Sequence, residues 1–135
     1  MIAAEMALEL EAKAMLESGW WNSYSNDTSQ RCNWPCISCN NTGSITKISP
    51  STDMIQVGDR FGNFSFSSFP NLVLDLSGRE LGGNIPPQIG ELREFKYLDL
   101  SNCELSGELP PSLGNLTQIE YLDISYNYII KTLHN

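Results

Sequence analysis

Apolar and polar positions repeat along the second half of the chain with a period of 24 residues. The segment 98–116 matches the segment 74–92 at 11 of 19 positions, and a third, partial copy begins at Thr117. In each copy a Leu-x-Leu alternation, as at Leu98 and Leu100, predicts a short strand with one buried face. The prolines and glycines that follow allow only a turn or a short 3-10 segment. Because one such unit cannot bury its apolar face alone, the pattern predicts coils that stack into a solenoid.

The repeat divides the chain into four parts. We expect an N-terminal cap at residues 1–69, a first repeat at 70–92, a second repeat at 93–116 and a partial third repeat at 117–135. The third copy lacks the glycine and the prolines of the other two. The apolar residues of this last coil are expected to lie uncovered, namely Leu122, Ile124, Ile129, Ile130 and Leu133. A chain with so few coils is predicted to be marginally stable or to self-associate.

A solenoid needs a cover at its end, and the first 69 residues have the composition for one. Residues 3–18 are rich in the helix formers Ala, Leu, Met and Glu, and Gly19 can end the helix. The stripe expected to be buried holds Met6, Leu8, Ala12, Met15 and Leu16. Two tryptophans follow, residues 44–49 alternate like a strand, and residues 50–59 indicate a loop. Four aromatic residues are expected to pack the cap onto the first repeat: Phe61, Phe64, Phe66 and Phe69.

Both full copies carry a Leu-x-Gly-x-Ile/Leu-Pro run and then an apolar residue followed by glycine. The run occupies residues 105–110, with Leu113-Gly114 after it, and residues 81–86, with Ile89-Gly90 after it. This motif resembles the leucine-rich repeat of the plant extracellular subtype. The resemblance covers roughly the C-terminal half of the chain. The resemblance implies an α/β solenoid fold. It would be a right-handed leucine-rich-repeat superhelix of short parallel strands and turn or 3-10 segments, with an N-terminal helical disulfide cap.

The N-terminal segments are similar to the same family. A helix, paired tryptophans, a Cys-x6-Cys segment with an internal Trp34 and a short strand resemble the cap of plant leucine-rich-repeat receptors. The resemblance implies a disulfide between Cys32 and Cys39. Cys36 and Cys103 are then expected to be unpaired and at least partly buried, with a Cys36–Cys103 bridge or a zinc site as alternatives. The cysteine spacing matches no common zinc motif, so we expect no metal ion.

In the family that the repeat resembles, an inward asparagine bonds to backbone groups of each turn. The corresponding column here reads Arg79, Cys103 and Asn127. Asn127 fits this role, and Cys103 is an accepted substitute in the family. Arg79 is expected to point outward, because a buried guanidinium without a partner is costly.

Composition narrows the range of partners and compartments. The 16 acidic and 8 basic residues argue against nucleic acid and anionic membranes as partners. Four cysteines suggest an oxidising compartment, and four N-glycosylation sequons agree with it, at Asn26, Asn40, Asn63 and Asn115. No signal peptide or membrane-spanning run is visible. We therefore expect an incomplete gene product of an extracellular or cell-surface protein, with no membrane insertion by this chain itself.

Catalytic chemistry finds little support in the sequence. The single histidine, His134, is the next-to-last residue, and no phosphate loop, metal-ligand pair or nucleophile motif is present. Kinase signatures are absent as well, although the resemblance is to ectodomains of receptor kinases. We expect no enzymatic activity and no cofactor, and any kinase activity would belong to a longer relative.

The concave face of the strands is where a ligand would bind. Its outward positions form columns one repeat apart: Asp75, Asp99 and Asp123; Ser77, Ser101 and Ser125; Tyr97 and Tyr121; and Gly78, Asn102 and Tyr126. Leu-Asp-Leu-Ser is a usual sequence in repeats of this kind, which favours a structural role for the Asp and Ser columns. Stacked carboxylates also suit a basic partner. Exposed tyrosines offer rigid contact area with a polar tip. The candidate ligand-binding residues are Tyr97, Asp99, Ser101, Asn102, Tyr121, Asp123, Ser125 and Tyr126.

The leading hypothesis is a non-enzymatic module that recognises a peptide or protein. The resemblance implies the N-terminal ectodomain piece of a plant leucine-rich-repeat receptor-like kinase or receptor-like protein. Its partners would be a peptide or protein ligand and a co-receptor, in extracellular signal perception. The alternatives are a secreted inhibitor similar to the polygalacturonase inhibitors and a truncated product with no function of its own.

Overall fold

The computed structural model describes residues 2–21, 27–49, 64–69 and 72–130 of the chain. The first part contains helix α1 (Ile2–Ser18), the 3-10 segment η1 (Thr28–Asn33) and the strands β1 (Ile37–Cys39) and β2 (Ile45–Ile48). The second part contains η3 (Phe66–Ser68), β3 (Val73–Asp75), η4 (Pro87–Glu91), β4 (Tyr97–Asp99), β5 (Ser106–Glu108), η5 (Pro111–Asn115), β6 (Tyr121–Asp123) and β7 (Tyr128–Ile130). The helix begins within one residue of its predicted start, and β2 lies inside the predicted strand 44–49.

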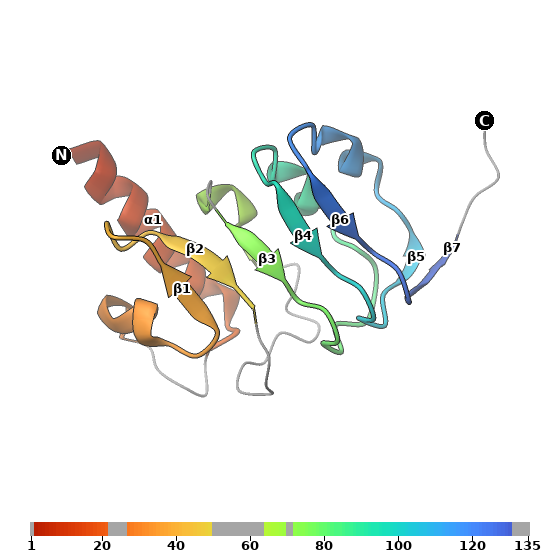
Figure 1. Cartoon of the computed structure of the whole chain (residues 1–135), viewed down its shortest axis with the longest axis horizontal. Coiled ribbons are helices and arrows are strands. Elements are labelled where there is room, and N and C mark those ends of the chain that lie inside the picture. The colour runs from red at the N-terminus through yellow and green to blue at the C-terminus, as the bar shows by residue number, and fades with distance from the viewer. Residues whose placement is uncertain (1, 22–26, 50–63, 70–71, 131–135) are drawn as a thin grey trace.

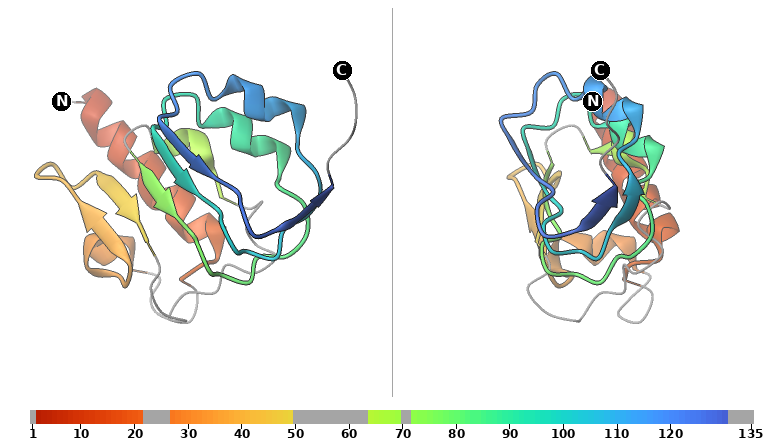
Figure 2. Two further views of the ribbon diagram at one scale, coloured as in Figure 1. Left: turned by 45° about the vertical axis from the view of Figure 1, so that its right-hand side comes forward. Right: turned by 90° about the vertical axis from the view of Figure 1, so that its right-hand side faces the viewer.

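Five strands form one sheet in the order β1-β2-β3-β4-β6 (Figure 1). β1 and β2 are antiparallel, and every later pair is parallel. Leu74 pairs with Leu98 and Leu98 with Leu122, so the register reproduces the period of the sequence. The chain returns to the same sheet after each period, and η4 and η5 lie on the far side of each coil, where α1 also lies (Figure 2). The predicted solenoid of short parallel strands and 3-10 segments is confirmed, whereas the exact repeat boundaries stay a prediction.

A second, two-stranded sheet lies away from the first and was not anticipated from the sequence. β5 pairs in parallel with β7, with Ser106 opposite Tyr128 and Glu108 opposite Ile130. The sequence signal for β5 is poor, because Ser-Gly-Glu has low strand propensity and Gly107 has φ of 77°. Backbone pairing between consecutive coils therefore makes this sheet, independently of side-chain propensity.

Leucines at the strand centres form the core, and each coil covers the preceding one. Leu74 and Leu98 are 0% exposed, whereas Leu122 at the equivalent position of the third coil is 40% exposed. Backbone bonds connect the coils as well: the Leu76 N–H donates to the Asp99 carbonyl at 2.9 Å, and the Leu100 N–H to the Asp123 carbonyl at 2.8 Å. Ile130 is also exposed, while Ile124 and Ile129 are half-buried and Leu133 lies outside the described residues. The expected uncovered face is thus present only in part.

Asn127 binds the turn of the preceding coil through both ends of its amide. Its Oδ1 accepts from the N–H groups of Cys103 (2.9 Å) and Leu105 (3.0 Å), and its Nδ2 donates to the carbonyls of Leu100 and Ile124, both at 2.9 Å. Cys103 occupies the same place one coil earlier. Its thiol donates at 3.0 Å to the carbonyl of Leu76, which is the counterpart of Leu100. The Cys103 thiol thus donates a hydrogen bond equivalent to the one that the Asn127 amide donates to Leu100.

The Cys103 thiol should resist alkylation while the protein is folded. Burial, and then the nearby carboxylates Asp99 and Asp75, raise the pKa of Cys103 to about 11, although backbone N–H groups of Arg79 and Gly78 oppose the rise. Its thiolate fraction at pH 8 is then about 240-fold below that of an ordinary cysteine. Because folding raises this pKa, the associated stability is intact below pH about 8.5 and is lost as pH rises through about 11.

Timed iodoacetamide labelling with mass spectrometry checks this expectation. The half-buried Cys36 should be modified first, and Cys103 only after urea is added. Equal labelling rates for the two thiols in the folded protein would contradict it.

Glycine is required at position 90 because the next coil approaches it closely, whereas the equivalent Gly114 has no such neighbour. A Cβ added at Gly90 would lie 2.6 Å from the Ser112 Cβ and 2.8 Å from the Ser112 carbonyl oxygen, whereas one at Gly114 would have nothing within 4 Å. We expect Gly90→Ala to destabilise the chain by about 1–3 kcal/mol, because the next coil must shift. Gly114→Ala should be near neutral in urea unfolding experiments. A neutral Gly90→Ala would show that the spacing between coils is adjustable at this point.

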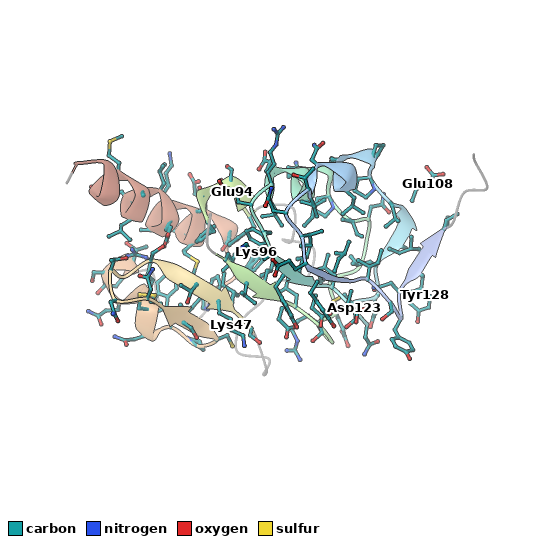
Figure 3. The ribbon with its side chains drawn as sticks, turned by 45° about the horizontal axis from the view of Figure 1, so that its top comes forward. Lys47, Glu94, Lys96, Glu108, Asp123 and Tyr128 are labelled. Atoms are coloured by element: carbon teal, nitrogen blue, oxygen red, sulfur yellow. A yellow bond between two sulfur atoms is a disulfide. The ribbon has the colours of Figure 1, made fainter. Side chains whose placement is uncertain are left out.

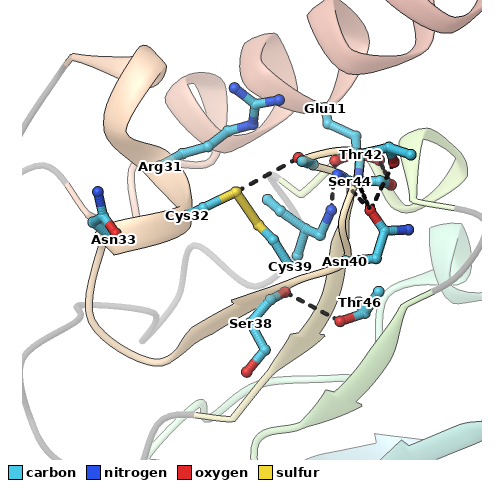
Figure 4. The surroundings of a disulfide bond; sticks show 12 residues. Glu11, Arg31, Cys32, Asn33, Ser38, Cys39, Asn40, Thr42, Ser44 and Thr46 are labelled. Carbon is cyan, nitrogen blue, oxygen red and sulfur yellow. Dashed lines mark hydrogen bonds between the residues drawn. A yellow bond between two sulfur atoms is a disulfide. The ribbon is translucent and has the colours of Figure 1, made fainter.

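The predicted stripe of the cap helix is only partly right: Met15 is buried and Leu8 and Ala12 are half-buried, but Met6 and Leu16 are exposed. Met6 and Leu16 are 56% and 48% exposed, while Glu11 and Met15 are 2% and 1% exposed. Apolar and charged residues are spread around the whole helix, so its apolar spacing does not select a face. The packed face includes Glu11, whose carboxylate accepts from the Ile45 N–H at 2.8 Å and from the Ser44 hydroxyl (Figure 4).

Stacked aromatic rings connect the cap with the first coil. The ring centroids of Trp20 and Phe64 are 4.5 Å apart, and those of Phe64 and Phe69 are 4.7 Å apart. The Trp21 indole N–H donates to the Pro35 carbonyl at 3.0 Å. Phe64 and Phe69 are buried, as predicted, whereas Phe61, the Phe66 side chain and the expected loop 50–59 lie outside the described residues.

The disulfide joins Cys32 to Cys39, with 5.8 Å between their Cα atoms, so the expected pairing is confirmed (Figure 4). Cys36 and Cys103 are free, which excludes the alternative bridge in this structure. Within the described ranges, no three His, Cys, Asp or Glu side chains are grouped as metal ligands. Arg79 is half-buried and not fully outward, because the turn that carries it contacts Cys103 of the next coil.

Candidate ligand-binding face

The outer face of the five-stranded sheet carries the predicted columns. Tyr97 pairs with Tyr121 and Asp99 with Asp123, so residues one period apart lie side by side. Side chains alternate along a strand, and Leu98 points into the core with 0% exposure. The tyrosine and aspartate columns therefore project from the opposite face, away from the core.

The rings of Tyr97 and Tyr121 are stacked, with centroids 4.5 Å apart and an angle of 8° between their planes. This spacing is close to the distance of about 4.8 Å between neighbouring strands, so each ring stands above its own strand. Tyr97 is half-buried, and Tyr121 is 42% exposed. The Tyr121 hydroxyl donates to Oδ2 of Asp123 at 3.3 Å. The two rings cover each other's inner faces, so the stack presents the ring edges, the two outer ring faces and the hydroxyl groups.

Each aspartate of the column accepts hydrogen bonds from the serine two residues later. Oδ1 of Asp99 accepts from the N–H of Ser101 at 2.9 Å and from its hydroxyl at 2.7 Å. The same pair of bonds recurs at Asp75 with Ser77 and at Asp123 with Ser125. These side-chain turns end each strand in the same way, which gives the serines a structural role.

Negative charge surrounds the tyrosine hydroxyls. Burial, followed by the charges of Asp75, Asp99 and Asp123, raises the pKa of Tyr97. Burial also raises the pKa of Tyr121, with Asp123 as the next contribution. Bonds from Ser125 lower the pKa of Asp123. Both phenols thus remain protonated and the Asp123 carboxylate remains charged at neutral pH.

The last candidate column stands at the turns after the strands. Gly78, Asn102 and Tyr126 all have left-handed backbone conformations, with φ of 76°, 54° and 57°. Asparagine tolerates this region, but a tyrosine costs roughly 1–2 kcal/mol there. The Tyr126 ring is 85% exposed, so no packing in the described part of the chain offsets that cost. Tyr126 lies at the edge of the face rather than in the tyrosine stack.

Lys47 belongs to the same face but was not among the predicted residues. It pairs with Val73, which in turn pairs with Tyr97, so the row reads Lys47, Val73, Tyr97 and Tyr121. Figure 3 labels Lys47, which belongs to β2, and Asp123, which belongs to β6. No sequence signal marks this lysine, because β2 lies outside the repeats and its register with β3 is a tertiary feature.

Two of the four sequon asparagines are described, and both are exposed. Oδ1 of Asn40 accepts from the N–H groups of Thr42 and Ser44, which forms a tight turn. Asn115 lies at the end of η5. Asn26 and Asn63 lie outside the described residues, and glycosylation at all four sites stays a prediction.

The fold and this face define a short leucine-rich-repeat solenoid with a disulfide-linked helical cap. The family model named Leucine Rich Repeat matches residues 94–116. A probable leucine-rich repeat receptor-like protein kinase of Arabidopsis thaliana is 39% identical over 75 residues, which is 54% of this chain and 6% of that protein. In the described segments, no helix has the length and apolar character needed to span a membrane.

Solved structures show the same relationship. The crystal structure of PEPR1–AtPEP1 matches with a TM-score of 0.58 and 28% identity, over 73% of this chain and 14% of the other. The BIR3–SERK2 complex from Arabidopsis thaliana matches with a TM-score of 0.58 and 25% identity, over 82% and 74% of the two chains. The ectodomain of the receptor kinase SOBIR1 from Arabidopsis thaliana has the same fold, with a TM-score of 0.62 and 20% identity over 90% and 68% of the chains. The chain therefore resembles plant leucine-rich-repeat receptor ectodomains, and it spans a small fraction of the kinase and PEPR1 chains.

Proposed function

We propose that this chain is a non-enzymatic recognition module whose outer sheet face binds a peptide or a protein segment outside the cell. The stacked pair Tyr97 and Tyr121 carries the proposal. It offers rigid apolar area, and its hydroxyls stand beside carboxylates that can accept hydrogen bonds from a ligand.

Three further observations support the proposal. The Cys32–Cys39 disulfide suits an oxidising compartment. Asn40 and Asn115 are exposed, as glycan acceptors must be. Of the similar structures, BIR3–SERK2 is named as a complex, and another is named PEPR1–AtPEP1.

Selection from a random peptide library on the immobilised, oxidised chain tests the proposal. Enriched peptides should bind at least about tenfold more weakly to the double variant Tyr97→Ser/Tyr121→Ser, since stacked aromatic anchors contribute most of the affinity at such sites. Tyr128→Ser is the matched control, because Tyr128 is 73% exposed but lies on β7, outside this face. Peptides that bind the double variant as well as the unaltered chain, or no enrichment at all, would overturn the proposal.

A further inference from the structure

The row that holds the tyrosine stack has an open position next to it. Val73 occupies the β3 place where the next two strands carry tyrosine. The face of the Tyr97 ring toward β3 therefore has no third aromatic ring on it among the described residues. A planar group held above Val73 would continue the stack at the strand spacing of about 4.8 Å.

The carboxylates beside this position have one oxygen each to offer. In Asp75 and Asp99, Oδ1 is occupied by the serine two residues later, whereas Oδ2 accepts no hydrogen bond from any described residue. Asp99 is only 8% exposed. Its Oδ2 is not among the fully buried atoms that lack a partner in the described part of the chain, so this oxygen is accessible to solvent. A ligand donor at this point takes the place of solvent and forms a charge-assisted hydrogen bond.

The carboxylate charges also act on the stack itself. The pKa of Tyr97 is raised first by burial and then by Asp75, Asp99 and Asp123, which places all three charges around one phenol. Lys47, in the same row, forms no ion pair with these aspartates among the described residues. The negative potential at the stack is thus not neutralised within the described part of the chain.

Deepening the proposed function, on which this inference rests, we infer that the ligand segment presents an arginine side chain to this face. Its guanidinium stacks on the Tyr97 ring above Val73 and donates to the free oxygens of Asp75 and Asp99. Guanidinium fits better than ammonium, because it is planar, stacks on aromatic rings and donates in a fork to carboxylates. A backbone or neutral amide would satisfy the oxygens but would leave the negative potential uncompensated.

The probe is Nα-acetyl-arginine N-methylamide, and its neutral isostere is the corresponding citrulline derivative. Titration of each into the full, oxidised chain is followed by NMR through the ring resonances of Tyr97 and Tyr121. The arginine probe should bind in the millimolar range and about five- to tenfold more tightly than the citrulline probe. Lys47→Met should tighten arginine binding by roughly twofold, since it removes a nearby positive charge.

A matched pair of triple variants separates a local site from overall charge. In Asp75→Asn/Asp99→Asn/Asp123→Asn, each amide oxygen still accepts from its serine, so the turns persist while the charge and free oxygens are lost. This variant should bind the arginine probe no better than citrulline. The control Glu9→Gln/Glu17→Gln/Glu108→Gln removes the same charge from exposed positions outside the face and should bind normally.

The outcomes are distinguishable from those of the peptide selection. Equal affinity for arginine and citrulline, or equal losses in both triple variants, would overturn the arginine assignment. If selected peptides depend on Tyr97 and Tyr121 but lack arginine and bind the Asp→Asn variant normally, the assignment fails while the proposed function stands. If selected peptides do not depend on the tyrosines, the proposed function fails.

Discussion

Leu98→Ala should lower the free energy of unfolding by about 3–4 kcal/mol, whereas Leu122→Ala should cost about 1 kcal/mol or less. Both leucines stand at the centre of a strand, and they pair with each other in register. Leu98 is 0% exposed because the third coil covers it, while Leu122 is 40% exposed. Truncating a fully buried leucine removes apolar contacts and leaves a cavity, but a half-open site loses less and can be filled by water.

Urea denaturation followed by tryptophan fluorescence measures both values, since the three tryptophans lie buried in the cap. Leu74→Ala is the positive control, because Leu74 is also 0% exposed in the same column. A cost at Leu122 equal to that at Leu98 would mean that Leu122 is covered in solution. Repeating the measurement at several protein concentrations would then test the predicted self-association, because coverage by a second copy makes stability concentration-dependent.

Glu11→Ala should destabilise the chain by about 2–3 kcal/mol, although Glu11 lies outside the repeats. Its carboxylate is 2% exposed and accepts from the Ile45 N–H at 2.8 Å and from the Ser44 hydroxyl. These bonds attach α1 to the first residue of β2, more than thirty residues away in the chain. Alanine would leave a buried N–H group without its acceptor, which costs more than the net value of a hydrogen bond.

Thermal and urea unfolding of two further variants distinguish loss of the acceptor oxygen from other effects of a substitution in this helix. Glu11→Gln keeps an acceptor oxygen for the Ile45 N–H and should cost only about 1 kcal/mol. Glu9→Ala alters an exposed residue on the same helix and should be near neutral. A Glu11→Ala variant as stable as the Glu9→Ala variant would show that the cap is held by its aromatic cluster alone.

Part of the candidate face follows directly from the repeat. Residues one period apart must be neighbours in stacked coils, so the pairing of Tyr97 with Tyr121 could be predicted from the 24-residue period alone. The contact to Lys47 could not, because β2 is not part of the repeat. The turn bonds that Ser101 donates to Oδ1 of Asp99 explain why the Asp-x-Ser sequence recurs, and they leave the second carboxylate oxygen for other contacts.

The cap shows where periodicity alone fails. An apolar stripe predicts a buried face only if the other faces are polar, and α1 carries exposed Met6, Leu10 and Leu16. Its orientation depends on Glu11, a residue that a hydrophobic pattern assigns to solvent. Local sequence also did not predict the second sheet. β5 forms through backbone bonds to β7 despite a sequence with low strand propensity.

The sequence by itself determined the solenoid, its 24-residue register and the columns on its outer face, because a periodic pattern fixes which residues are stacked. The tertiary structure alone decided which helix face packs, which leucines are covered and which carboxylate oxygens remain free. Those properties depend on contacts between segments far apart in the chain, and local patterns carry no information about such contacts.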